Sequence, residues 1–209
     1  MEQLEAYVKS LIPNRDLLVE EIERKAVVDH VPIMDLISME ALLQQLKLIK
    51  PERILEIGTA IGYSAIRMSQ ATGAHVVTIE RDEQRYEQAI QNIRQAGLAD
   101  KIEVYFADAL QFVEKLESST YFDVLFIDAA KGQYQRFFEL FEPYVKTGGV
   151  IFSDNVLFRG LVAEDEVESK RLRKLVEKIK AYNIWLMEHP RYDTRIVPMG
   201  DGLAISIKR

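Results

Sequence analysis

The sequence contains no cysteine. This absence excludes disulfide bonds, thiolate zinc sites and cysteine nucleophiles. The three histidines, His30, His75 and His189, are scattered along the chain and show none of the spacings that are typical of a zinc cluster. Chemistry based on thiolates or on grouped imidazoles is therefore not expected.

Long apolar runs are also missing. No stretch approaches the roughly 18 uninterrupted apolar residues of a membrane-spanning helix. The first residues, Met1–Glu5, are acidic and lack the basic segment followed by an apolar run that is typical of a secretory signal. These absences predict a soluble, cytoplasmic protein.

Basic residues are fewer than acidic residues: 27 Lys and Arg against 33 Asp and Glu, which gives a formal net charge of -6 at pH 7. This balance argues against a protein that wraps a long stretch of nucleic acid through its overall field, although a local basic patch remains compatible with it. The 209 residues, 48% of them hydrophobic, have an ordinary globular composition. They predict a single domain over residues 1–209.

The first fifty residues predict a helical cap (1–50) ahead of a core over residues 51–209. Apolar residues recur at three- and four-residue spacing between Leu36 and Ile49, which is typical of a helix with one buried face. Pro51 follows the last expected helical turn and leads into the first expected strand.

Short apolar runs alternate with amphipathic segments from Arg53 onward. The segments Asp82–Ala96 and Tyr134–Val145 are long enough for helices, and Gly97 and the Gly148-Gly149 pair fall where helices are expected to stop. Such an alternation is typical of a buried parallel sheet with right-handed crossovers. The expected strands are Arg53–Gly58, His75–Glu80, Ile102–Asp108, Phe122–Asp128 and Val150–Asp154.

The end of the chain predicts a β-hairpin, because Thr194–Pro198 and Leu203–Ile207 flank a Gly200-Asp201-Gly202 turn. Together with the five parallel strands, the hairpin predicts a mostly parallel seven-stranded sheet with a final antiparallel strand. The fold class is therefore α/β and Rossmann-like, with helices on both faces and extra N-terminal helices.

The loop after the first strand carries Gly58 and Gly62 in a Gly-x-x-x-Gly spacing. This spacing departs from the Gly-x-Gly-x-x-Gly of dinucleotide binders, whose loop must hold a pyrophosphate, and it disfavours a nicotinamide cofactor. S-adenosylmethionine has no phosphate and needs only room for its methionine part. A plain strand–helix turn is the alternative interpretation of this glycine pair.

Carboxylates at the ends of the second and third strands favour a bound adenosine, because ligands of such sheets bind outside the carboxyl ends of the strands. Glu80 could accept hydrogen bonds from both ribose hydroxyls, and Asp108 could reach the adenine amino group. Taken singly, Glu80 could instead be an acid at a helix start and Asp108 a helix N-cap.

Asp128, Asp154 and Asn155 follow the fourth and fifth strands, which we expect on one side of the switch point of the sheet. They would converge as three hard oxygen ligands with room for water, which suits Mg²⁺. The alternative is an ordinary Asp-Asn turn beside an ordinary helix cap.

Several of these segments together resemble the motifs of one family. They are Glu56–Ser64, Glu80, Asp108-Ala109, the Phe-Ile-Asp-Ala-Ala-Lys run at 126–131 and the Ser-Asp-Asn at 153–155. The family is that of the cation-dependent class I O-methyltransferases, which includes the catechol and caffeoyl-coenzyme A enzymes and their bacterial relatives. The resemblance covers nearly the whole chain, from about Val31 to the terminal hairpin. Among bacterial members, the chain is most similar to the group that methylates 5-hydroxyuridine at the tRNA wobble position.

The resemblance implies S-adenosylmethionine as methyl donor, a homodimer, and a role for each matching residue. Asp128, Asp154 and Asn155 match the Mg²⁺ ligands, and Lys131 matches the proposed general base, with Asp128 as its catalytic neighbour. The matching cofactor-contacting positions are Met34, Glu56, Gly58, Ser64, Glu80, Asp108, Ala109 and Asp128. A solvated lysine at a helix start is the alternative for Lys131.

The acceptor is less well determined than the chemistry. Catechols and 5-hydroxyuridine both place a hydroxyl beside a second oxygen, so either could chelate a metal. Ala129 and Ala130 stand where the animal catechol enzymes carry larger side chains, so a catechol pocket does not transfer unchanged. A non-catalytic module that binds S-adenosylmethionine is the alternative from another class.

Basic and aromatic residues near the site would favour tRNA as the acceptor, whereas the acidic run Glu164–Glu166 and the net charge favour a small catechol-like phenol. The candidates for RNA contact are Arg24-Lys25, Phe158-Arg159, Arg191-Tyr192, Arg195 and a cluster of Lys170, Arg171, Arg173, Lys174 and Lys178 on an expected helix. A solvated helix face is the alternative for that cluster.

Overall fold

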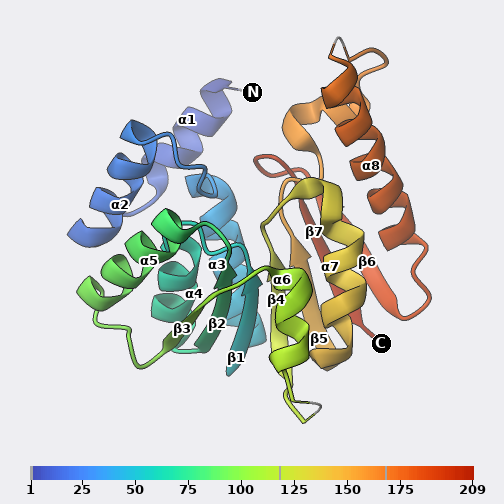
Figure 1. Cartoon of the computed structure of the whole chain (residues 1–209). Helices are drawn as coiled ribbons and strands as arrows, with labels where there is room; N and C mark the ends of the chain where they lie inside the picture. Colours follow the sequence, from blue (N-terminus) through green and yellow to red (C-terminus); the bar gives the residue numbers. More distant parts are fainter. Residues whose placement is uncertain (1, 118, 168) are drawn as a thin grey trace.

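A seven-stranded sheet with the strand order β3-β2-β1-β4-β5-β7-β6 runs through the centre of the computed structural model, which describes residues 2–117, 119–167 and 169–209 (Figure 1). The first five strands are parallel, and β7 runs antiparallel to both β5 and β6. The strands are β1 (Arg53–Ile57), β2 (His75–Glu80), β3 (Ile102–Phe106), β4 (Phe122–Ile127), β5 (Val145–Ser153), β6 (Tyr192–Val197) and β7 (Leu203–Lys208). The mostly parallel sheet and its terminal hairpin confirm the predicted fold class.

The sheet has an apolar core on each face, because successive side chains of a strand point to opposite sides. Ile54 of β1 stands in register with Val76 and Val124, and all three belong to one core. The next residue, Leu55, stands in register with Val77 and Leu125, and these belong to the other core. Burial of both faces explains why the strands read as continuous apolar runs.

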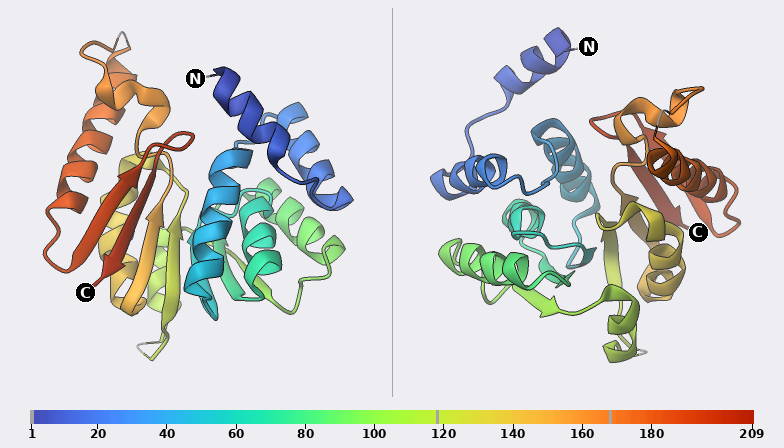
Figure 2. Two further views of the ribbon diagram at one scale, coloured as in Figure 1. Left: turned by 180° about the vertical axis from the view of Figure 1, so that it is seen from behind. Right: turned by 45° about the horizontal axis from the view of Figure 1, so that its top comes forward.

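Two layers of helices cover these cores (Figure 2). One core includes side chains from the N-terminal helices and from the helices that follow β1 and β2; the other includes side chains from the helices that follow β3, β4 and β5. The helices are α1 (Glu2–Leu11), α2 (Leu17–Val28), α3 (Leu36–Ile49), α4 (Tyr63–Thr72), α5 (Glu83–Gln95), α6 (Ala109–Phe112), α7 (Tyr134–Phe141) and α8 (Lys170–Met187). Within the described ranges, no helix is long and apolar enough to cross a membrane.

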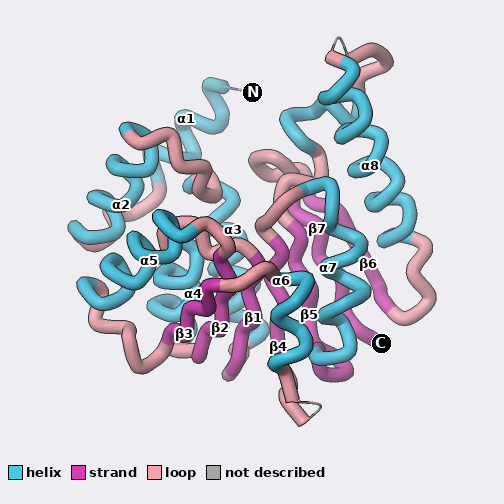
Figure 3. The backbone as a smooth tube through the Cα atoms, in the orientation of Figure 1, coloured by secondary structure: helices cyan, strands magenta, loops and turns pink. Residues whose placement is uncertain are grey.

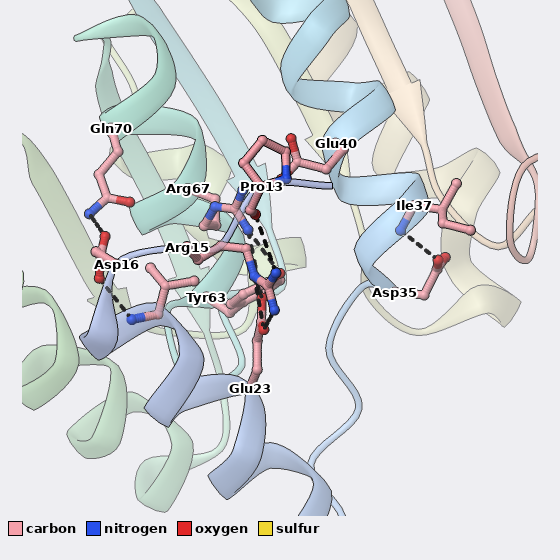
Figure 4. Close-up of polar contacts among 11 residues, drawn as sticks. Pro13, Arg15, Asp16, Glu23, Asp35, Ile37, Glu40, Tyr63, Arg67 and Gln70 are labelled. Carbon is pink, nitrogen blue, oxygen red and sulfur yellow. Dashed lines mark hydrogen bonds and ion pairs between the residues drawn. The ribbon is translucent and has the colours of Figure 1, made fainter. Parts of the chain in front are cut away.

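Polar contacts also fasten the N-terminal helices to the core (Figure 4). The Arg15 guanidinium donates to the Glu23 carboxylate of α2 at 2.8 Å, and the Tyr63 hydroxyl of α4 donates to the same carboxylate at 2.8 Å. Arg67 of α4, only 7% exposed, pairs with Glu40 of α3 at 2.5 Å. Because breaking a buried ion pair leaves a desolvated charge, this network fixes α2 and α3 relative to α4.

One stretch differs from the sequence-based expectation. The helix expected over Tyr134–Val145 ends at Phe141, and a 3₁₀ turn η3 (Glu142–Tyr144) with Pro143 in its first turn leads into β5. A proline cannot continue the hydrogen-bonding of a helix, so the chain turns here. The Gly148-Gly149 pair lies inside β5 rather than at a helix end, beside a shift in the β4–β5 register.

Candidate active site

A cavity of about 1020 Å³ lies at the carboxyl ends of β1, β2, β4 and β5. Figure 3 shows loops gathered at this edge of the sheet. The cavity is lined by residues of these loops, of the terminal hairpin turn, of α1, and of a 3₁₀ segment η4 (Phe158–Ala163). This is the place where ligands bind in sheets of this topology.

The loop between β1 and α4 brings its backbone against the end of β4. Gly58 has a φ of +103°, and a Cβ atom on it would lie 2.1 Å from the carbonyl oxygen of Asp128. Gly62, with a φ of +84°, is the N-cap of α4. Only glycine allows both the left-handed backbone and the close approach at residue 58, so the first glycine of the pair is required by packing.

The Glu80 carboxylate is held at the end of β2 by three backbone amides. Oε2 accepts from the Ala60 amide at 2.8 Å, and Oε1 accepts from the amides of Arg81 and Asp82, each at 2.9 Å. Glu80 lines the cavity and is 7% exposed. Since a carboxylate offers about four acceptor positions, it can still accept from a ligand diol. Its ribose role stays a prediction.

Glu56 and Ser64 lie beneath the glycine loop and do not line the cavity. The Glu56 carboxylate is fully buried, and it accepts from the Ser64 hydroxyl and, at 2.5 Å, from the Thr78 hydroxyl. Burial raises the pKa of Glu56 to about 7, while these two hydrogen bonds oppose the rise. Thr78 was not singled out in the sequence, although it interrupts the apolar run of β2.

The carboxylate that follows the third strand, that of Asp108, belongs to a helix cap. The Asp108 carboxylate accepts from the Leu110 amide at 2.9 Å and so caps α6. Asp108 does not line the cavity, whereas Ala109 and Met34 do. A contact between Asp108 and adenine stays a prediction.

Asp128, Asp154 and Asn155 converge at the ends of β4 and β5, and all three line the cavity. The Asn155 amide nitrogen donates to Asp154 Oδ2 at 3.0 Å, and Lys131 Nζ donates to Asn155 Oδ1 at 2.5 Å. Lys131 begins the 3₁₀ turn η2 (Lys131–Gln133). The structure therefore brings together the four residues predicted for metal binding and proton transfer.

Burial raises the pKa of the Asp128 carboxyl, and the charge of Lys131 opposes this rise. Burial also raises the pKa of Asp154 well above its ordinary value, and the neighbouring charge of Asp128 adds to the effect. Desolvation thus disfavours the ionised form of both carboxyls, and repulsion by Asp128 adds to this effect at Asp154. The described residues include no group of three His, Cys, Asp or Glu side chains arranged for a metal ion; the cluster here consists of two carboxylates and one amide.

Tyr134 is a nearby residue that the sequence reasoning missed. Its side chain is 1% exposed, and its hydroxyl has no hydrogen-bond partner among the described residues. Burial raises the pKa of Tyr134, and the charges of Asp128 and Asp154 add to the shift. Its place three residues after Lys131, at the first position of α7, is the only signal in the sequence.

Of the other residues expected near the acceptor, some line the cavity and others do not. Arg159 and Phe158 line the cavity, with the Phe158 ring centroid 5.8 Å from Lys131 Nζ. Arg191 and Tyr192 both hydrogen-bond to the buried Glu142 and do not reach the cavity. The remaining candidates do not line it either; among them, Lys25 pairs with Glu21 and Arg195 with Asp193.

Comparison with known proteins agrees with this geometry. A family model described as O-methyltransferase matches residues 10–209. A caffeoyl-CoA O-methyltransferase of Populus kitakamiensis is 32% identical over 167 residues, which cover 77% of this chain and 71% of the relative. A solved structure of a caffeoyl-CoA O-methyltransferase candidate from Staphylococcus aureus is 35% identical, with a TM-score of 0.89, and covers 100% of this chain and 98% of that one. A methyltransferase of Podospora anserina solved with bound S-adenosylhomocysteine (SAH) is 26% identical, with a TM-score of 0.87 and coverage of 100% and 94%.

Proposed function

Because the chain belongs to the O-methyltransferase family and is an S-adenosylmethionine-dependent enzyme of the caffeoyl-CoA type, we propose that its reaction requires Mg²⁺. We further propose that the acceptor presents a hydroxyl beside a second oxygen, and that this acceptor is 5-hydroxyuridine at the tRNA wobble position. The product would then be 5-methoxyuridine.

The neighbouring carboxylates of the half-buried Asp128 and the buried Asp154 are the observation that carries the metal proposal. Burial raises the pKa of both carboxyls, and the charge of Asp128 adds to the rise at Asp154. A divalent cation bound at this point would favour the ionised form of both groups. The carboxylate oxygens and the Asn155 amide oxygen are hard ligands of the kind that Mg²⁺ takes, with water and acceptor oxygens completing its shell. When bound, Mg²⁺ would lower the pKa of the acceptor hydroxyl and fix its direction.

The side chains around this centre have separate roles in the proposal. Glu80 accepts from the ribose hydroxyls, and the Gly58–Gly62 loop leaves room for the methionine part of the cofactor. Lys131, held on Asn155 Oδ1 at the cavity wall, accepts the proton of the acceptor hydroxyl when its own amine is unprotonated. Positioning of the ionised oxygen in line with the methyl–sulfur bond supplies much of the rate enhancement.

The other residues that match cofactor-contacting positions either line the cavity or lie behind its wall. Met34 and Ala109 line the cavity and would touch the cofactor directly. Glu56 and Ser64 would act through the loop above them, since both are buried beneath it. Asp108 would reach the adenine only with the part of its carboxylate that the α6 cap leaves open.

Support for tRNA comes from the resemblance to the 5-hydroxyuridine methyltransferases and from basic side chains at the cavity. Lys9, Arg81, Arg85 and Arg159 line it together with Lys131. A small catechol-like phenol is the second candidate, favoured by the exposed acidic run Glu164–Glu166, which directly follows η4. The name of the Populus relative also supports this second candidate, because caffeoyl-CoA carries a catechol.

The acceptor is tested by methyl transfer from labelled S-adenosylmethionine, with Mg²⁺, to tRNA lacking 5-methoxyuridine and to a simple catechol. Label in tRNA that maps to the wobble uridine supports the first candidate. Label in the catechol alone assigns the enzyme to small phenols and overturns the tRNA proposal.

We also propose a homodimer. The side chains of Tyr7 and Leu11 on α1 are 61% and 63% exposed, although they are large and apolar. Such residues on an outer helix suit a contact with a second copy of the chain. Sedimentation equilibrium tests this, and a monomer at micromolar concentration contradicts it.

A further inference from the structure

We propose that one flank of α8, formed by Lys170, Lys174 and Lys178, binds the phosphate backbone of the RNA acceptor and guides it to the cavity. This inference rests on the proposed tRNA acceptor. It concerns a surface that the reaction itself does not use.

The three lysines form a row because they are four residues apart. At about 100° per residue, each step of four turns the side chain by only about 40°, so all three lie on one flank, and the row is about 12 Å long. All three are exposed. Val176 and Ile179 are buried and turn the other side of the helix to the protein. Phosphate groups along an extended strand could contact the row in succession.

The inner end of the row lies beside the reaction centre. A methyl group on Gly132 would be 3.8 Å from Lys178 Nζ, and Gly132 directly follows Lys131 in η2. The outer end is the start of α8, which extends past the carboxyl edge of the sheet (Figures 1 and 2). A strand that follows the row from Lys170 to Lys178 therefore arrives next to Lys131.

The charges of the row are available for a ligand. In the described part of the chain, none of the three lysines forms an ion pair, whereas Lys25 pairs with Glu21 and Lys146 with Asp123. In a chain with a net charge of -6, three adjacent lysines without a carboxylate partner are a local departure from the overall field. Contacts of this kind position a nucleic acid without reading its sequence.

A different flank of α8 supplies a matched control. Arg173 and Lys180 are seven residues apart, so they lie close together in projection, about 100° and 120° from Lys174 at the centre of the lysine row. Both are exposed. A double variant on each flank removes two positive charges from the same helix. The two variants differ only in the side of the helix from which the charges are removed.

The experiment compares Lys174→Ala/Lys178→Ala with Arg173→Ala/Lys180→Ala in the full-length protein. The readouts are the Kd of a fluorescent tRNA by anisotropy at several salt concentrations and the Kd of S-adenosylhomocysteine. We expect the first variant to raise the tRNA Kd about tenfold and to reduce the salt slope by about 1.5, since each phosphate contact contributes about 0.7 to 0.9. The second variant should change the tRNA Kd less than about twofold, and neither should change cofactor binding.

Equal loss in both variants, or no loss in the first, overturns the inference, even when the wild type methylates tRNA. A wild-type protein that binds no tRNA overturns the proposed acceptor and this inference with it. If Lys174→Ala/Lys178→Ala raises the KM for a catechol coenzyme A ester and leaves tRNA binding unchanged, the flank binds nucleotide phosphates instead. This result likewise overturns the RNA assignment.

Discussion

Gly58 lies directly against the carbonyl oxygen of Asp128, and a Cβ atom at residue 58 would be 2.1 Å from that oxygen. The two residues belong to different parts of the site, because Gly58 begins the proposed cofactor loop and Asp128 is a proposed metal ligand. The amide of Asp128 also donates to the Ile57 carbonyl at 3.0 Å. The position of the loop is therefore coupled to the position of the metal ligand.

Gly58→Ala should weaken both stability and cofactor binding. The added methyl group meets backbone atoms that cannot rotate away, and the φ of +103° is unfavourable for alanine. We expect the free energy of unfolding to fall by more than about 2 kcal/mol and the S-adenosylhomocysteine Kd to rise at least about tenfold. Urea unfolding and calorimetry measure the two effects.

Gly73→Ala is the control, because Gly73 has a φ of +74° but open space around its Cβ position. It should cost only the backbone strain of about 1 to 2 kcal/mol and leave cofactor affinity unchanged. Equal effects of the two substitutions would show that the contact with Asp128 is unimportant.

Glu80→Ala should weaken binding of S-adenosylmethionine, since it removes the acceptor for the ribose hydroxyls and releases three backbone amides. We expect a ten- to hundredfold rise in Kd by calorimetry, or about 1.4 to 2.7 kcal/mol. Asp82→Ala is the matched control, because Asp82 caps α5 but does not line the cavity. Unchanged affinity in Glu80→Ala would remove Glu80 from the ribose role.

The burial of Glu56 predicts a pH dependence of stability. Its pKa is raised to about 7 in the folded protein, so the folded state binds more protons than the unfolded state between about pH 4.5 and 7. Stability from this group is present below that range and is lost as the pH rises through 7, by on the order of 3 kcal/mol. Glu56→Gln should flatten this part of the profile when urea unfolding in EDTA is compared at pH 5 and pH 8.

Asp128 and Asp154 also have raised pKa values and are present in both proteins, so the difference between wild type and Glu56→Gln isolates Glu56. An identical difference in stability between pH 5 and pH 8 in the two proteins would contradict the assigned pKa.

The sequence predicted the carboxyl edge of the sheet because strand ends are local signals. Asp128 and Asp154 each follow an apolar run, and parallel topology alone brings such positions together. The same reasoning did not show that Glu56 lies under the loop. Its side chain is held there by hydrogen bonds from Ser64 and Thr78, which lie 8 and 22 residues further along the chain.

Helix boundaries and side-chain partners were harder to predict. The segment after Phe141 was expected to remain helical because its apolar spacing continues to Val145, but Pro143 and the pairing of β5 with β4 decide the outcome. For Asp108, the sequence was compatible with both a helix cap and a ligand contact. The hydrogen bond to Leu110 shows the cap, and no local pattern distinguishes the two.

The most direct test of the metal-dependent reaction is the rate of methyl transfer by wild type and Asp154→Ala, each treated with EDTA and then supplied with Mg²⁺. Asp201→Ala, which removes another carboxylate-bearing side chain from the cavity lining, is the control. We predict that EDTA stops methyl transfer by the wild type and that Mg²⁺ restores it. Asp154→Ala should be inactive under both conditions. Its S-adenosylhomocysteine Kd should stay within about threefold of wild type, because only the metal is lost. Turnover that survives EDTA, or equal turnover in wild type and Asp154→Ala, would contradict the account.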